Sequence, residues 1–178
     1  MYAVLYHPSY PPLQNYRLFN LYEAVVKEVA NLEHKLEIVL QSWQPAQLKS
    51  VGSIKGIGKR ATAMLIVFTQ GFKNTHSHRQ LISFAGLAPT EYSSGSSIQG
   101  KPRICKRGGK PLRDVLYMCA MSAIKHNQVC KELFDRLKAK GKNGKVALIA
   151  MGNKLLKQAF AVAKSGGLYQ PNYSSVRP

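Results

Sequence analysis

The most regular hydrophobic pattern in the chain lies near its N-terminus. Between residues 18 and 40, apolar side chains recur in steps of four and three, at Leu18, Tyr22, Val25, Val29, Leu32, Leu36 and Val39. That spacing places them on one stripe of a helix, as in the a/d seam of a coiled coil. Asn20 is a candidate N-cap, and Gln44-Pro45 ends the pattern. The pattern predicts a helix over 18–42, which is either a coiled coil or an amphipathic helix packed on its own domain.

Helical spacing returns further along the chain, whereas residues 1–17 are rich in Tyr and Pro and show no period. Ser, Thr and Asn as N-caps, Pro in a first turn and Gly at a C-terminus mark helix ends. These signals predict helices from Thr75 or Ser77 to near Gly86, from Pro111 to Asn127, over 129–141 and over 145–163. Strand patterns are scarce, and residues 96–105 offer one short hairpin. The fold class is therefore mainly α, with a tail over 1–17, the helix over 18–42, a compact helical domain over 47–165 and a tail over 166–178.

A glycine-rich turn precedes one of these helices. The stretch I-K-G-I-G-K-R-A-T-A, from residue 54, resembles a helix-hairpin-helix turn. Gly56 and Gly58 let the backbone bend tightly, and N–H groups at the start of the following helix can hold a phosphate. The cations nearby are Lys55, Lys59 and Arg60. A P-loop is excluded because Ser53 stands where its first glycine would be. The alternative is that G-x-G is only a turn.

Charge narrows the range of functions. The net charge is +18, from 26 Lys and Arg against 8 Asp and Glu. Such an imbalance indicates an anionic partner, with nucleic acid first and an anionic membrane surface second. Trp43 is the sole Trp, so an interfacial aromatic face is missing and the membrane interpretation is weak. The three cysteines form no C-x-x-C pair, which argues against zinc, and free thiols without a signal peptide predict a cytoplasmic protein.

The carboxylates offer little for metal chemistry. Four of them lie on the predicted 18–42 helix, and Glu91, Asp114, Glu132 and Asp135 stand singly among cations. Two-metal nucleases need clustered oxygen ligands, so this chain is not expected to bind catalytic magnesium by itself. No G-x-S-x-G elbow surrounds Ser93 or Ser94, which argues against a Ser-His-Asp hydrolase.

What remains is attack on a phosphate by a hydroxyl group. Ser94 directly precedes Gly95 in the run S-S-G-S-S. A serine can take a phosphodiester into a covalent link without a metal when cations neutralise the non-bridging oxygens. The cations that follow are Lys101, Arg103, Lys106, Arg107, Lys110 and Arg113. On composition alone, a solvated Ser/Gly loop is the simpler interpretation.

The order of motifs adds a resemblance. G-I-G-K-R-A-T-A, G-L-A-P, S-G-S-S, I-C-K-R-G-G-K-P-L-R and K-H-N follow one another across roughly 47–165. This order resembles the C-terminal domain of the insertion-sequence 110 family of transposases, which includes the Piv-type DNA invertases. The resemblance implies that Ser94 is the nucleophile on DNA, with Ser93 as the neighbour most easily confused with it.

The family pattern also implies features outside this chain. Its members place a RuvC-like domain with acidic magnesium ligands before the coiled coil, act as oligomers on DNA, and in several cases use a structured guide RNA. This chain begins just before the predicted coil, so that domain is expected to be absent and magnesium is expected only with it. The resemblance therefore predicts a truncated or partial transposase in a prokaryotic cytoplasm, at the nucleoid, that binds double-stranded DNA and pairs through residues 18–40.

Two functions follow from these patterns. The first is strand cleavage and transfer by Ser94 in DNA transposition or site-specific recombination. The alternative is a non-catalytic nucleic-acid-binding module, built from the helix-hairpin-helix-like turn and the basic helices, which is the expected residual activity of a truncated chain.

Overall fold

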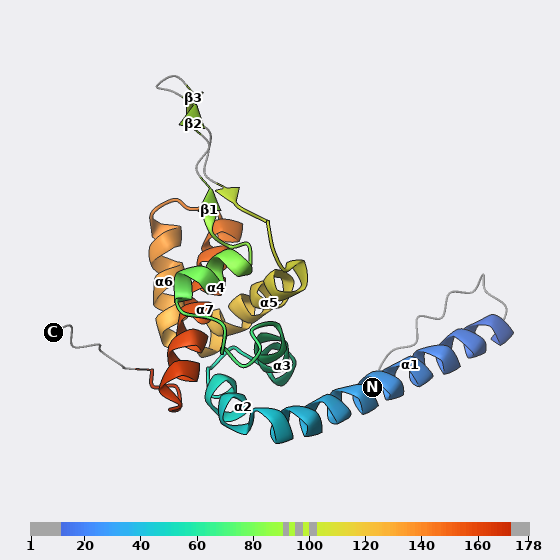
Figure 1. Ribbon diagram of the computed structural model, residues 1–178. Coiled ribbons are helices and arrows are strands. Elements are labelled where there is room, and N and C mark those ends of the chain that lie inside the picture. The colour runs from blue at the N-terminus through green and yellow to red at the C-terminus, as the bar shows by residue number, and fades with distance from the viewer. Residues whose placement is uncertain (1–11, 91–92, 95–97, 100–102, 172–178) are drawn as a thin grey trace. The chain divides into compact units, whose positions relative to one another are not determined.

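The computed structural model describes residues 12–90, 93–94, 98–99 and 103–171, and the side chains of 12–15, 93–94 and 98–99 lie outside that description. Two units divide the chain, Met1–Val39 and Leu40–Pro178. The helices are α1 (Pro12–Trp43), α2 (Pro45–Gly52), α3 (Lys59–Phe68), α4 (His78–Phe84), α5 (Lys110–His126), α6 (Gln128–Ala139) and α7 (Gly144–Ser165) (Figure 1). The strands are β1 (Pro89–Thr90), β2 (Ser93–Ser94), β3 (Ile98–Gln99) and β4 (Arg103–Ile104). The prediction of a mainly α fold is confirmed.

The N-terminal helix is longer than its heptad pattern predicted. It begins at Pro12 rather than at residue 18, so Asn20 lies inside α1 and the prediction that it caps the helix is wrong. The physical reason is that Pro suits a first helical turn, where its missing N–H is not needed. The predicted end is correct, because α1 stops at Trp43 and Pro45 opens α2.

The second unit has its core between α5 and α7. These helices pack on each other and on α6, while α4 and α2 contact α7 and α3 contacts α5. Leu112 and Leu116 of α5 and Met151 and Leu155 of α7 are fully buried. Gly152 also lies at this contact, where a Cβ would meet Leu116 at 3.8 Å, an ordinary van der Waals distance. Large apolar side chains packed between facing helices thus form the core of the unit.

Helix caps define the other boundaries. The Ser77 hydroxyl accepts a hydrogen bond from the backbone N–H of Gln80 at 3.2 Å and starts α4. Asn127 caps α6, and the Asn143 side chain accepts from the N–H of Lys145 at 2.9 Å to start α7. Gly166, with φ of 68°, ends α7 in the left-handed conformation that favours glycine. Of the two predicted caps for α4, Ser77 is the one confirmed.

One helix, α7, is long and apolar enough by composition to cross a membrane. Met151, Leu155, Leu156 and Ala159 on this helix are completely buried against the other helices of the second unit. These contacts are those of the central helix of a packed domain.

The strands form two antiparallel pairs within one excursion between α4 and α5. In the outer pair, Pro89 lies opposite Ile104 and Thr90 opposite Arg103. In the inner pair, Ser93 lies opposite Gln99 and Ser94 opposite Ile98. The excursion therefore starts at residue 89, earlier than the 96–105 hairpin that the sequence predicted.

Candidate nucleic-acid interface

The predicted nucleophile lies in the excursion of residues 89–104, hereafter the serine hairpin. Ser94 is the last residue of β2, and the next residue is Gly95. Its backbone is paired with Ile98 of β3, and that of Ser93 is paired with Gln99. The side chains of both serines, and Lys101 as a whole, lie outside the described residues. The backbone register thus places Ser94 at the end of a strand, next to the connection that closes the inner pair.

The base of the hairpin is joined to the helical domain by backbone hydrogen bonds. The N–H of Cys105 donates to the carbonyl of Ala88 at 2.8 Å, and that of Lys106 donates to Gly86 at 3.1 Å. The Thr90 hydroxyl also donates to the Arg103 carbonyl at 2.9 Å. These bonds continue the β1–β4 ladder toward α4 and α5. They fix where the serine hairpin leaves the domain.

Glycine is required at the point where these two segments meet. Gly108 has φ of 134°, and a Cβ on it would overlap the carbonyl oxygen of Phe84. Gly86 has φ of 67° and lies against the Arg113 guanidinium and the Arg107 carbonyl. The K-R-G-G and G-L-A-P stretches therefore meet as two backbones in close contact, which side chains at these positions would separate.

The predicted phosphate-binding cations near the hairpin divide into two groups. Arg103, Lys106, Arg107 and Lys110 are exposed at or just beyond the hairpin base. Arg113 is half-buried, and its Nη1 donates to the Ala85 carbonyl at 3.2 Å. Arg113 thus ties the start of α5 to the end of α4, whereas the other four present charge to solvent.

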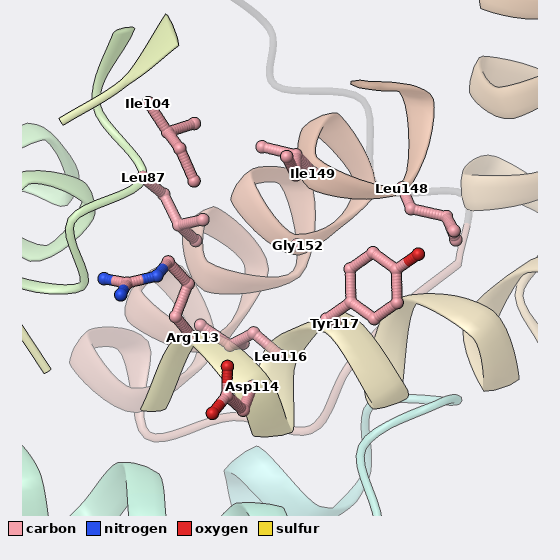
Figure 2. Close-up of a pocket in the computed structure, with 9 residues that line it drawn as sticks. All are labelled: Leu87, Ile104, Arg113, Asp114, Leu116, Tyr117, Leu148, Ile149 and Gly152. Atoms are coloured by element: carbon pink, nitrogen blue, oxygen red, sulfur yellow. The ribbon is translucent and has the colours of Figure 1, made fainter. Parts of the chain in front are cut away.

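A cavity of about 170 Å³ lies beside the hairpin base, between α5 and α7. Figure 2 shows Leu87 and Ile104 on one side, Tyr117 and Leu148 on the other, and the Arg113 head group reaching away toward the Leu87 segment. Asp114 is the one carboxylate among the residues that line it. The lining is mostly aliphatic, so the cavity lacks the convergent polar groups that an active site for phosphate chemistry needs.

The second cationic region is the segment 53–60 between α2 and α3, hereafter the basic turn. Ile54 and Ile57 are buried, while Lys55, Lys59 and Arg60 are exposed. Alternation of buried isoleucines and exposed cations fixes which side of the turn faces solvent.

The two glycines of the basic turn differ in why they are needed. Gly56 has φ of 103°, and a Cβ there would lie 2.6 Å from the Cβ of Ala123 on α5. Gly58 is the N-cap of α3 in an extended conformation, and a Cβ there would meet nothing within 4 Å. Gly56 is thus required by packing, whereas Gly58 leaves the N-terminus of α3 open to a ligand.

Asn127, at the junction of α5 and α6, anchors the basic turn. Its Nδ2 donates to the Lys55 carbonyl at 3.2 Å, and its Oδ1 accepts from the N–H of Cys130 at 3.4 Å. The Tyr169 hydroxyl donates to the same oxygen at 3.3 Å, and the Tyr169 N–H donates to the Ser53 hydroxyl at 2.8 Å. One buried amide therefore connects the basic turn, the start of α6 and the segment after α7.

Two of the three thiols are held in their neutral form. Burial raises the pKa of Cys119, opposed by a hydrogen bond with the backbone of Gly58. Burial also raises the pKa of Cys130, opposed by the nearby charge of Lys154. A thiol is nucleophilic only as a thiolate. Neither side chain is therefore suited to covalent chemistry at neutral pH.

Carboxylates do not gather in the described part of the chain. Among those residues, no three His, Cys, Asp or Glu side chains are close enough to hold a metal ion together. Magnesium supplied by another domain therefore stays a prediction of the family resemblance.

Several helices of the second unit begin with cations instead of acids. α3 starts with Lys59 and Arg60, α5 with Lys110, and α7 has Lys145 in its first turn; none of these first turns contains an acid. The positive end of the helix dipole disfavours a cation there by about 0.3–1 kcal/mol. An anion bound at such a helix end would offset this unfavourable energy by attracting both the cation and the helix dipole. These helix ends are therefore more stable in a complex with a polyanion than in the unbound protein.

Sequence reasoning missed several residues of this interface. Tyr169 carries no sequence feature that marks it, and its role comes from the return of the chain after α7. Lys125 and Lys131 lie on either side of the α5–α6 junction and line a cavity with Lys55. The K-H-N motif, which includes Lys125 and Asn127, is the signal that could have found this region.

The sequence is similar to a family of transposases and to proteins of mobile DNA elements. Residues 48–135 match the family model described as Transposase IS116/IS110/IS902 family. The chain is 30% identical over 147 residues to the uncharacterized 43.6 kDa protein of insertion element IS110 from Streptomyces coelicolor, covering 83% of this chain and 36% of that protein. It is 34% identical over 139 residues to the pilin gene-inverting protein of Moraxella lacunata, covering 76% of this chain and 43% of that protein.

A third relative is the pilin gene-inverting protein of Moraxella bovis, 34% identical over 115 residues, which cover 64% of this chain and 36% of that protein. The chain thus spans less than half the length of these relatives. The matched region contains the basic turn, the serine hairpin and the α5–α6 junction. The chain belongs to the IS116/IS110/IS902 transposase family, whose family model matches residues 48–135.

Proposed function

We propose that this chain binds DNA and supplies Ser94 as the nucleophile for strand cleavage and transfer in a transposition or inversion reaction. The observation that carries the proposal is the position of Ser94 at the end of β2, in a hairpin with exposed cations at its base. The family match spans this hairpin, and two relatives are described as gene-inverting proteins. DNA inversion, like transposition, requires phosphodiester bonds to be broken and rejoined.

The proposed step conserves phosphoester bonds. The Ser94 Oγ attacks the phosphorus, a bond from Oγ to phosphorus forms, and the bond to a deoxyribose oxygen breaks. The serine proton passes to a base, and the departing oxygen takes up a proton. A second deoxyribose hydroxyl then attacks the phosphoserine and restores the serine, so no external energy source is consumed.

Cations stabilise the charge that develops in this step. Arg103, Lys106 and Arg107 are exposed close to where the hairpin joins the domain. Guanidinium and ammonium groups form charge-assisted hydrogen bonds to non-bridging phosphate oxygens. We expect these residues to hold the DNA backbone together with Lys110, and the sequence predicts the same role for Lys101. The basic turn, as a helix-hairpin-helix-like element, provides a second backbone contact through Lys55, Gly58, Lys59 and Arg60.

Pairing of two chains through α1 is part of the proposal. The seven seam residues of 18–40 are all exposed along the helix, with Leu18 65% and Leu36 39% exposed. Recombination of two DNA sites requires two copies of the cleaving group, which a coiled-coil pair would supply. A structured guide RNA is a further expected partner, and the prokaryotic cytoplasm, at the nucleoid, the expected location.

A suicide DNA substrate tests the nucleophile. We expect a covalent protein–DNA adduct when the chain is combined with the part of the Streptomyces coelicolor relative that it does not match, since the chain covers only 36% of that protein. Ser94→Ala should abolish the adduct, whereas the matched control Ser93→Ala should retain it. Equal circular dichroism spectra would show that both variants fold.

Three results would count against the proposal in different ways. An adduct that survives Ser94→Ala refutes the assignment of the nucleophile. Loss of the adduct in Ser93→Ala but not in Ser94→Ala moves the role to its neighbour. Salt-dependent DNA binding without any adduct in the combined system leaves a non-catalytic binding module as the function.

A further inference from the structure

A second cavity lies on the side of the domain that carries the basic turn. It is an open pocket of about 160 Å³, lined by Lys55 of the basic turn, the α5–α6 junction and the segment after α7. Figure 1 shows the end of α7 next to α2, which brings these three segments together. A single water needs about 10–15 Å³ of such space, so the cavity has room for a group much larger than one water.

The lining of this cavity is cationic. Lys55, Lys125, His126 and Lys131 are among its lining residues, and all four are exposed to solvent. None of its described lining residues is a carboxylate. The nearest acid in sequence, Glu132, accepts a hydrogen bond from Gln128 Nε2 at 2.9 Å. Three lysines at the rim of one small space raise its positive potential and favour an anion there.

The walls of the cavity are fixed by buried hydrogen bonds. Asn127, only 3% exposed, holds the Lys55 carbonyl and the first turn of α6. Tyr169 also lines the cavity, and Gln158 Nε2 donates to its hydroxyl at 3.2 Å. The lysine backbones on α5, α6 and the basic turn are therefore set in place before a ligand binds, which reduces the entropy cost of binding.

We propose that this cavity binds one phosphate group of a nucleic-acid backbone, held by Lys55, Lys125 and Lys131. The inference rests on the proposed function and adds a defined phosphate site to it. A nucleic acid fits better than a free anion because Lys59 and Arg60 extend the cationic surface from Lys55 along the start of α3. The backbone can thus run from the cavity past the N-terminus of α3.

The site predicts a specific loss on charge removal. The double variant Lys125→Gln/Lys131→Gln of the full chain should bind a 20-base-pair duplex about tenfold more weakly than the unmodified chain. Its log affinity against log salt should be less steep by about 0.9, because one phosphate contact is lost. Lys73→Gln/Lys142→Gln removes the same charge from exposed positions outside the cavity and should change affinity less than threefold. Lys125→Arg/Lys131→Arg should restore most of the affinity.

Amide NMR spectra of the full chain locate the contact independently. Titration with the duplex should shift the signals of residues 124–131 and Tyr169, and inorganic phosphate should shift the same signals at much higher concentration. Equal losses in the cavity variant and the control would overturn the site but leave DNA binding intact. Shifts with inorganic phosphate but not with duplex would overturn the nucleic-acid assignment. No duplex binding by the unmodified chain would instead overturn the proposed function.

Discussion

The basic turn and the serine hairpin both carry exposed cations, but they are held in different ways. In the basic turn, Ile54 and Ile57 are buried, and Gly56 lies directly against Ala123 of α5. In the hairpin, Pro89, Thr90 and Arg103 are exposed, and its described backbone pairs are only two residues long in each ladder. The basic turn is thus packed into the core, whereas the serine hairpin is joined to the core only at its base.

This difference separates two tasks. A region packed on the core keeps its shape and can hold a phosphate at a fixed position. A hairpin joined at its base can present a group beyond the packed surface, where it can meet a second DNA strand or another protein chain. We interpret the basic turn as the positioning element and the serine hairpin as the reacting element. Variants that damage one region at a time test whether the two are independent.

The largest effect is expected at the hairpin base. Gly108→Ala introduces a Cβ at φ of 134° that overlaps the Phe84 carbonyl. Strained backbone and overpacking each cost about 1–3 kcal/mol, so we expect a loss of about 4 kcal/mol in the free energy of unfolding. Urea denaturation measures this loss. Gly109→Ala is the control, since a Cβ there would lie 3.6 Å from Leu112, an ordinary contact. Equal stability of both variants would contradict the close approach.

The corresponding change in the basic turn should cost somewhat less. Gly56→Ala at φ of 103° places its Cβ 2.6 Å from the Cβ of Ala123, and α5 must shift to make room. We expect a loss of about 3 kcal/mol by the same two terms. Gly58→Ala, with open space around its Cβ, should cost less than about 1 kcal/mol.

DNA binding then shows whether the regions act separately. Folded Gly56→Ala protein should bind duplex DNA more weakly at low temperature, where it remains folded, while Gly58→Ala should keep most of its affinity. If Gly58→Ala loses affinity and Gly56→Ala does not, the exposed N-terminus of α3 matters more than the shape of the turn.

Local sequence patterns predicted the helices of this fold better than the contacts between them. The helical domain, the α4 cap at Ser77 and the end of α1 followed from local patterns of apolar, capping and Pro residues. The beginning of α1 did not, because Pro12 starts a helix ahead of the heptads. The exposed positions of Lys55 and Lys59 agree with the alternation in I-K-G-I-G-K. The burial of Asn127 and its bond to Lys55 join residues 72 positions apart, which no local pattern contains.

The middle-sized effect concerns this long-range connection. Asn127→Ala removes the cap of α6, the donor to Lys55 and the acceptor for Tyr169. Loss of a cap costs about 1 kcal/mol and buried groups without partners cost about 1–3 kcal/mol, so we expect a total near 2–3 kcal/mol. Asn127→Asp keeps an acceptor for the cap, but it removes the donor to the Lys55 carbonyl and places a buried carboxylate beside that oxygen, so it should also be destabilised. Thermal unfolding measures both losses, and an Asn127→Asp variant as stable as the unmodified chain would contradict the contact with Lys55.

The smallest expected effect is a difference in reactivity between the thiols beside the serine hairpin and the basic turn. Cys105 follows the serine hairpin and is half-buried, whereas Cys119 lies behind the basic turn and Cys130 at the start of α6, both buried. Burial raises the pKa of Cys119 and Cys130, so the folded state favours their protonated form. Iodoacetamide at pH 8 should modify Cys105 at least tenfold faster, because only the thiolate reacts and access to the other two is restricted. Mass spectrometry of peptides gives the three rates.

The raised pKa of these two thiols also makes the stability of the fold depend on pH. The raised pKa means that the native state holds the Cys119 and Cys130 protons more tightly than the unfolded chain does. Their contribution to stability is therefore complete below the ordinary thiol pKa of 9.0 and decreases as pH rises above it. Cys119→Ser/Cys130→Ser should lose part of this decrease between pH 9 and 11. If the basic turn opened as readily as the serine hairpin, Cys119 would be modified as fast as Cys105, and the contrast between a fixed and an attached cationic region would fail.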